Sequence, residues 1–205
     1  MNVILANGDF PVSDTLRTAL QQASFLICCD GAANACLEHG IEPHVIIGDV
    51  DSVSETVRNR YAERIIRISE QETNDLTKAV KYALSLGYDN LLILGATGLR
   101  EDHTLANISL LMDYAEEATV CMESDYGCFY PCHNVCDLIV ERGTEVSIFN
   151  FGAIDFSSEG LLYPLYNFEK LWQGTLNVAT TEQIRITAKG RFLVYVSKET
   201  SKALH

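Results

Sequence analysis

Acidic residues and glycines recur directly after short apolar runs in the first part of the chain, and together they could hold a metal ion and a phosphate group. Carboxylate oxygens are the ligands that a hard cation prefers, and glycine lets backbone amides approach an anion closely. The candidate residues are Asn7, Gly8 and Asp9; Asp30 and Gly31; Asp49 and Asp51; Thr73, Asn74 and Asp75; and Thr97, Gly98, Arg100, Asp102 and His103.

The stretch Gly48-Asp49-Val50-Asp51-Ser52 is the best candidate for a metal site. Two aspartates that are two residues apart at a strand end can point to the same side, and Asp75 arrives from a neighbouring strand end. We therefore predict that Asp49, Asp51 and Asp75 hold Mg²⁺, which binds through carboxylates together with substrate phosphates. The alternative is that Asp51, Ser52 or Asn74 only caps the following helix, with Asp49 in a turn.

The segment GATGLREDH, residues 95–103, is a candidate phosphate loop. Its glycines would expose backbone amides, and Arg100 can bind phosphate oxygens with two parallel hydrogen bonds. It has neither the GK[ST] ending of a P-loop nor a complete GxGxxG motif. The alternative is a tight turn from strand to helix in which Asp102 is the N-cap.

A parallel sheet would bring these scattered residues together. The predicted strands are residues 3–6, 25–29, 45–47, 65–68, 91–94 and 119–122, and the predicted helices are residues 13–22, 32–39, 75–86 and 103–116. Strands alternating with helices predict a doubly wound, mainly parallel sheet with helices on both faces, and ligands bind beyond the carboxyl ends of such strands. In the helix over 75–86, apolar residues recur at three- and four-residue spacing and Gly87 ends it.

The pattern changes after about residue 124 to short strands separated by turn residues. DLIVERGTEVSIFNFG predicts a hairpin turned at Arg142-Gly143, and EQIRITAKGRFLVYVS predicts another turned at Lys189-Gly190. The chain is thus expected to be α/β, with an α/β domain over residues 1–123 and a β-rich second domain over residues 124–205.

Composition excludes several classes of partner. The net charge of −13 would repel nucleic acid and an anionic membrane surface, whereas ATP remains possible when a cation accompanies it. No apolar run approaches the roughly 20 residues of a membrane span, and the N-terminus has no basic leader. The odd number of cysteines, seven, fits a reducing compartment, so a cytoplasmic location is expected.

Four ordered motifs of the first domain, CDGAAN, GDVDSV, ETNDLTKAV and GATGLREDHTLANI, resemble the thiamine pyrophosphokinase family. Weaker matches follow in the β-rich part, at GTEVSIF, GLLYPL and GTLN. The resemblance implies a homodimer that transfers pyrophosphate from ATP to the hydroxyl of thiamine, giving thiamine diphosphate and AMP. It also implies an N-terminal nucleotide-binding domain and a C-terminal sandwich that binds thiamine near the subunit interface.

Carried over by motif, the resemblance assigns Asp49, Asp51 and Asp75 to Mg²⁺ on the ATP phosphates. Arg100 and Asp102 would shape the polyphosphate site, and Asp30, beside the reacting groups, is hypothesised to be a base or orienter for the thiamine hydroxyl. Tyr163, Leu176 and Asn177 would contact thiamine, with Tyr163 preferred over Trp172 as a stacking residue. The chain departs from the family pattern at Leu176, where many members have Ser, at Asn74 in place of Thr, and at Leu99 in place of Gly.

Three other interpretations stay open at this point. A Mg²⁺-dependent phosphatase could use Asp49 as a covalent nucleophile, although such enzymes carry this motif after their first strand. A non-catalytic module could bind nucleotide or thiamine without turnover. Cys128, Cys132, His133 and Cys136 could bind zinc, but the spacing has no CxxC pair.

Overall fold

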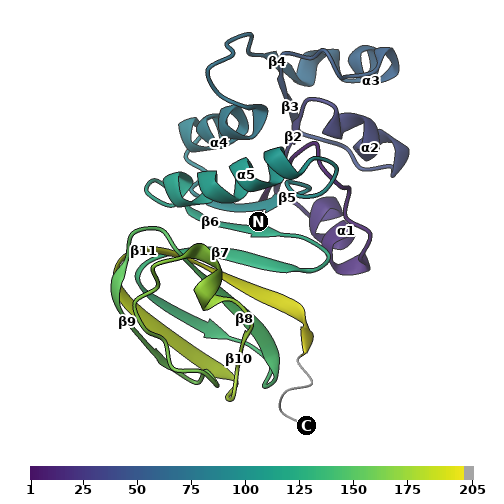
Figure 1. Ribbon diagram of the computed structural model, residues 1–205. Coiled ribbons are helices and arrows are strands. Elements are labelled where there is room, and N and C mark those ends of the chain that lie inside the picture. Colours follow the sequence, from purple (N-terminus) through teal and green to yellow (C-terminus); the bar gives the residue numbers. More distant parts are fainter. Residues whose placement is uncertain (201–205) are drawn as a thin grey trace. The chain divides into compact units, whose positions relative to one another are not determined.

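The computed structural model describes residues 1–200, which form two compact units. The first unit is Met1–Asp125 and the second begins at Tyr126. Within the described residues, the first unit contains every α-helix, and the second is built from strands with one short 3-10 helix (Figure 1). The mixed α/β class predicted from the sequence is therefore confirmed.

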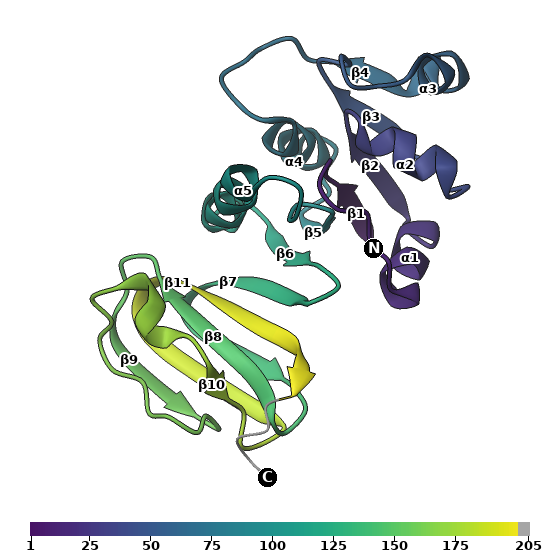
Figure 2. The same ribbon diagram turned by 45° about the vertical axis from the view of Figure 1, so that its right-hand side comes forward.

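The first unit is a parallel sheet with helices against it. The strand order is β6-β5-β1-β2-β3-β4, and each neighbouring pair in this series is parallel. Figures 1 and 2 show α4 and α5 on one side of these strands and α1, α2 and α3 on the other. The elements are β1 (Asn2–Leu5), α1 (Asp14–Gln21), β2 (Phe25–Cys29), α2 (Ala32–Glu38), β3 (Val45–Gly48), α3 (Glu55–Arg60), η1 (Ala62–Arg64), β4 (Ile65–Arg67), α4 (Asp75–Ser85), β5 (Asn90–Leu94), α5 (Glu101–Tyr114) and β6 (Thr119–Glu123).

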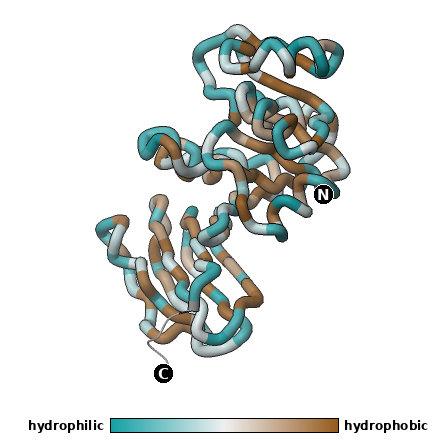
Figure 3. Tube along the Cα trace, turned by 90° about the vertical axis from the view of Figure 1, so that its right-hand side faces the viewer, coloured by the Kyte–Doolittle hydropathy of each residue, from teal (hydrophilic) through white to brown (hydrophobic). Residues whose placement is uncertain are grey.

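Burial explains why these segments fold as they do. The central strands are apolar on both faces because both are covered, and Ile4, Ile27 and Ile46 are at most 1% exposed. Figure 3 shows hydrophobic stretches in the interior of the first unit. Helix α4 buries Ala79 and Val80 on its apolar stripe, and Gly87, at φ +81°, follows its end as predicted. Helix α3 was not predicted.

The second unit is an antiparallel arrangement centred on the long strand β11. Along its length β11 pairs with β7, while its other edge pairs first with β9 and then with β8. Apolar side chains from these strands, including Phe156, Phe192 and Ile186, form a separate core. The elements are β7 (Gly127–Ile139), β8 (Thr144–Asn150), β9 (Ile154–Glu159), η2 (Leu171–Gly174), β10 (Asn177–Val178) and β11 (Gln183–Thr200).

Both predicted hairpins of the second unit are wrong. Strands β7 and β8 flank the turn at Arg142-Gly143, but each pairs with β11. At Lys189-Gly190 the chain does not reverse: β11 continues through an irregularity, and residues on both sides pair with β7. Gly190, at φ +119°, donates its N–H to Asn134 Oδ1 at 2.9 Å. The glycine therefore forms a bulge that bends one strand and not a turn.

Among the described helices, none combines the length and apolar character needed to cross a membrane.

Candidate active site

A cavity of about 410 Å³ lies where the parallel strands of the first unit end. Its lining follows β1 through Asn7 and Gly8, β2 through Asp30, and β3 through Asp49 and Asp51. The segments after β4 and β5 complete it. The cavity therefore occupies the place at which a parallel sheet presents residues from several strands to one ligand.

Asp30 is the buried acid of this cavity. It follows β2 directly and has a left-handed backbone conformation, with φ +40°. Its side chain packs against Gly48, where an added Cβ would lie only 2.9 Å from the Asp30 Cβ. The residue is 4% exposed; Oδ2 accepts a hydrogen bond from Ser52 N at 3.2 Å, and Oδ1 has no partner among the described residues. Burial raises the pKa of Asp30, and the hydrogen bond from Ser52 opposes this rise.

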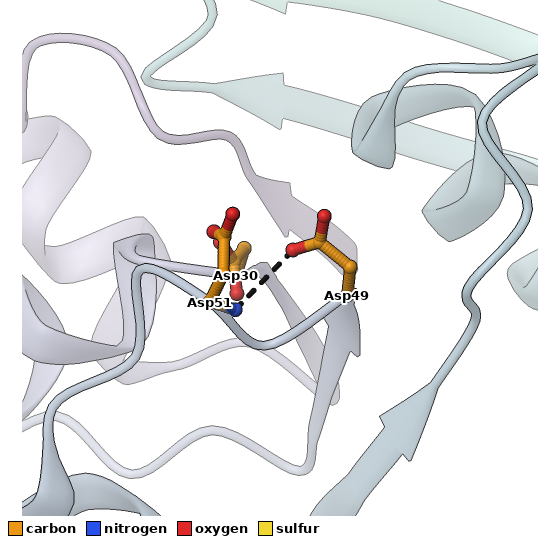
Figure 4. Close-up of side chains that lie close together, drawn as sticks. All are labelled: Asp30, Asp49 and Asp51. Atoms are coloured by element: carbon orange, nitrogen blue, oxygen red, sulfur yellow. Dashed lines mark hydrogen bonds between the residues drawn. The ribbon is translucent and has the colours of Figure 1, made fainter.

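Asp49 and Asp51 complete a compact group of carboxylates with Asp30. One carboxylate oxygen from each lies within 4.8 Å of the others (Figure 4). Asp51 N donates to Asp49 Oδ1 at 3.2 Å, a bond that lowers the pKa of Asp49, and Ser52 Oγ donates to Asp51 Oδ1 at 2.9 Å.

This group fits a divalent cation in two respects. Three carboxylates this close repel one another unless positive charge lies between them, and the buried Oδ1 of Asp30 lacks a hydrogen-bond donor. Oxygen-only ligands with open positions for water or phosphate are what Mg²⁺ takes.

Asp75 lines the same cavity but has a different partner. Its Oδ1 is 3.0 Å from Nζ of Lys78, whose side chain is only 4% exposed. The compact three-carboxylate group thus contains Asp30 and not Asp75. Asp75 forms an ion pair with Lys78, which lies one turn further along α4. Asn74 caps α4, since its Oδ1 accepts from Thr77 N at 2.9 Å, so the capping interpretation is right for this residue.

The glycine-containing loops after β1 and β5 are joined by backbone hydrogen bonds. Gly8 N donates to Gly95 O at 2.7 Å, and Asp9 N donates to Thr97 O at 2.9 Å. Gly98 has φ +78°, and a Cβ there would lie 2.0 Å from an oxygen of Asp9. The loops therefore need small residues at these points, and Gly8 and Gly98 both line the cavity.

Arg100 is an exposed cation at the edge of the cavity. Its guanidinium makes two hydrogen bonds to Asp102, of 3.1 and 2.6 Å, and this contact lowers the pKa of Asp102 to about 2. Asp102 lies within the first turn of α5 and Arg100 occupies the N-cap position, so the interpretation of Asp102 as N-cap is wrong. The Arg100 side chain can reorient toward an anion because it is 66% exposed.

The cavity gathers most, but not all, of the residues predicted for the first domain. Asp9, Gly31, Thr97 and Asp102 are adjacent to lining residues without lining it themselves, whereas Thr73 and His103 do line it. The sequence reasoning missed Lys78 and Asn107, both of which line the cavity. Both stand inside the motifs quoted above, and Asn107 donates to Ala96 O at 2.9 Å.

A smaller cavity, of about 210 Å³, lies within the second unit and is lined by Tyr163, Leu176 and Asn177. Asn177 is buried; its side chain donates to Tyr163 O at 2.8 Å and accepts from Tyr163 N at 3.0 Å, so it fixes this segment. Leu176 is 70% exposed at φ +62°. Trp172 is exposed and does not line this cavity.

Across residues 1–200, the three aspartates are the only clustered set of His, Cys, Asp or Glu side chains suited to a metal. The zinc interpretation of Cys128, Cys132, His133 and Cys136 therefore gains no support.

Two family models match the chain in succession. Residues 16–122 match the thiamin pyrophosphokinase catalytic domain, and residues 127–195 match the thiamin pyrophosphokinase substrate-binding domain. Thiamin pyrophosphokinase 1 of Caenorhabditis elegans is 26% identical over 217 residues, covering 96% of this chain and 88% of the relative. Thiamine pyrophosphokinase of Bacillus subtilis is 32% identical over 112 residues, covering 53% and 52% of the two chains.

Solved structures share the fold. The crystal structure of thiamine pyrophosphokinase from Bacillus subtilis superposes with a TM-score of 0.82 at 21% identity, covering 97% of this chain and all of the other. Thiamin pyrophosphokinase from Candida albicans gives a TM-score of 0.80 at 19% identity, covering 97% and 89%. At these identities the superpositions establish the fold alone, and the family models establish the family.

Proposed function

Because the chain belongs to the thiamin pyrophosphokinase family and transfers pyrophosphate from ATP to thiamine, we propose that its catalytic centre is the carboxylate group of Asp30, Asp49 and Asp51 with a bound Mg²⁺. The observation that carries this proposal is the convergence of three carboxylates on one point, with the unpaired Oδ1 of Asp30 among them. The family assignment supplies the reaction, and the geometry supports the place where it occurs.

Transfer of a phosphoryl-type group depends mainly on positioning and on neutralising charge at the phosphate oxygens. A bound Mg²⁺ would supply that neutralising charge at the carboxylates. Hydrogen bonds from Asp51 N and Ser52 Oγ hold the carboxylates of Asp49 and Asp51 in defined orientations. Asp75, which pairs with Lys78, lines the same cavity and would supply a further carboxylate to the cation.

Asp30 has a second candidate role in the same centre. Its pKa is raised by burial, which makes its carboxylate a better proton acceptor than an exposed aspartate. It could therefore orient the thiamine hydroxyl or accept its proton. The metal role has the stronger geometric support, because Asp30 belongs to the compact group.

The loops around the carboxylates suit a polyphosphate. We assign the ATP phosphates to the face formed by Asn7, Gly8 and Gly98, next to Thr97, where the exposed Arg100 would bind them. The exposed arginine provides positive charge for a polyphosphate in a chain whose net charge is −13. His103 and Asn74 line the same cavity.

The proposal extends to the organisation of the whole protein. The first unit would be the doubly wound catalytic domain over residues 1–123, and the following part a β-sandwich that binds thiamine through Tyr163, Leu176 and Asn177. The exposed apolar side chains of Tyr163, Tyr166 and Leu176 support a homodimer in which a partner covers them. A cytoplasmic location accords with the free cysteines of the described chain.

The test of the carboxylate assignment is substitution of Asp49 and Asp51 by Ala, one at a time. Each variant should lose thiamine diphosphate formation while keeping the wild-type circular dichroism spectrum and melting temperature, because the cation loses a ligand that the fold does not need. Asp89→Ala, which removes an exposed carboxylate between α4 and β5, is the matched control and should stay active. Near-normal turnover in both Asp49→Ala and Asp51→Ala would refute the metal assignment.

A further inference from the structure

The loop that carries Asp49 and Asp51 has a backbone conformation that its sequence disfavours. Val50, between the two aspartates, has φ +69°. A β-branched residue rarely adopts the left-handed region, because its side chain crowds the backbone there. Contacts from the surrounding structure are therefore needed to keep Val50 in this conformation.

Two side chains from neighbouring helices hold this loop through its main chain. On α3, Arg58 Nη2 donates to Val50 O at 2.7 Å and to Asp51 O at 3.3 Å. On α2, Asn34 donates to Ser52 O at 2.8 Å and accepts from Ser54 N at 2.9 Å. The Arg58 contacts lie at the strained residue, and the Asn34 contacts lie at the other end of the loop.

The contacts of Arg58 distinguish it from the other arginines of the same region. Within residues 1–200, Arg58 forms no ion pair with a carboxylate, whereas Arg60 and Arg64 both pair with Glu42. Its guanidinium is instead directed at two carbonyl oxygens of the loop, although Asp49 and Asp51 are nearby. Because Arg58 binds these carbonyl oxygens and not the carboxylates of Asp49 and Asp51, both carboxylates remain available to another cation.

We propose that Arg58 is a positioning residue for the reaction: by binding the carbonyls of Val50 and Asp51 it keeps Val50 left-handed and directs the carboxylates of Asp49 and Asp51 toward Asp30. The proposal rests on the function proposed above, in which these carboxylates hold a divalent cation. Arg58 acts through the loop and touches neither the cation nor the substrates.

A purely electrostatic role for Arg58 predicts the opposite sign. Removing a positive charge close to three carboxylates should strengthen the binding of a divalent cation, because the repulsion between the arginine and the cation is lost. Removing a residue that positions the ligands should weaken binding, and changes in the groups that orient metal ligands typically weaken it about 10- to 100-fold. The direction of the change therefore separates the two roles.

The experiment measures binding of Mn²⁺ alone to the full-length protein by electron paramagnetic resonance, without nucleotide or thiamine. Arg58→Ala should bind Mn²⁺ about 10-fold more weakly than wild type. Arg58→Lys should be intermediate, since an ammonium keeps the charge but not the planar fork. Arg60→Ala is the matched control: it removes the same charge from the same helix and should bind as wild type.

Steady-state kinetics give a second readout. Arg58→Ala should lower kcat with little change in the KM for thiamine, which a general loss of folding would not produce. Val50→Gly should reduce the effect of Arg58→Ala on Mn²⁺ affinity, because glycine adopts positive φ without strain. Equal or tighter Mn²⁺ binding by Arg58→Ala, with its circular dichroism unchanged, would overturn the proposal; if that variant is unfolded, wild-type affinity in Arg58→Lys would do so. If wild type itself binds no Mn²⁺ there, the proposed metal site fails first.

Discussion

Replacement of Asp30 by Asn should make the protein more stable and less able to use a divalent cation. In the absence of a cation the carboxylate of Asp30 is nearly fully buried, has one hydrogen bond, and leaves Oδ1 without a partner. Burial of an ionised carboxyl group is costly, and the neighbouring Asp51 and Asp75 add repulsion. An uncharged amide of the same shape keeps the Ser52 contact, so we expect Asp30→Asn to raise the free energy of unfolding by about 1–2 kcal/mol at neutral pH.

The sign of the pH dependence follows from the raised pKa of Asp30. The folded state binds this proton more tightly than the unfolded state, so the carboxyl favours folding at low pH, and that contribution is lost as pH rises through its folded pKa. The stability advantage of Asp30→Asn should therefore be small below pH ~3.9, the unfolded value, and should reach a plateau above the raised pKa.

Urea denaturation with and without Mg²⁺ measures both effects. A ligand at 100 times its dissociation constant stabilises the folded protein by about 2.7 kcal/mol, so Mg²⁺ should stabilise wild type and have much less effect on Asp30→Asn. Asp89→Asn, which neutralises an exposed carboxylate outside the cavity, should have the same free energy of unfolding as wild type in both conditions. The reasoning is refuted if Asp30→Asn is less stable than wild type without Mg²⁺, or if Mg²⁺ stabilises the variant as much as it stabilises wild type.

Two further predictions concern the phosphate face. Gly98→Ala should weaken ATP binding and lower the melting temperature, because φ is +78° there and the new Cβ would collide with Asp9; an unchanged calorimetric affinity for ATP would contradict the assigned role of this loop. The carboxyl of Asp102 should titrate near pH 2 in carbon-detected NMR and shift upward, toward ~3.9, in Arg100→Ala, because Arg100 stabilises its ionised form. No shift in that variant would show that the pair is not formed in solution.

The parallel sheet could be predicted from the sequence because its strands are buried on both faces. An uninterrupted apolar run such as Phe25–Cys29 is readable without knowledge of its neighbours, and β2 has those bounds. The second unit could not be predicted in this way. Gly190 was interpreted as a turn residue, but pairing with β7 on both sides makes it a bulge, and a local sequence does not encode which strand will lie beside it.

The candidate site, like the fold, could be predicted from the sequence only in part. That acids at strand ends share one cavity follows from parallel topology, so Asp49 and Asp51 could be found from the sequence. That Asp30 joins their compact group, with Asp75 paired to Lys78, depends on side-chain directions that spacing does not give. Arg58 was missed because it binds carbonyl oxygens, and every residue has one.

The central claim is Mg²⁺-dependent transfer of pyrophosphate from ATP to thiamine at the carboxylates of the first unit. Phosphorus NMR of the protein with ATP, thiamine and Mg²⁺ tests it most directly. Thiamine diphosphate and AMP should appear in equal amounts, and both should vanish on addition of EDTA and return with excess Mg²⁺. Release of inorganic phosphate without thiamine diphosphate would instead support a phosphatase that uses Asp49 as nucleophile, and product formation that persists in EDTA would contradict the metal site.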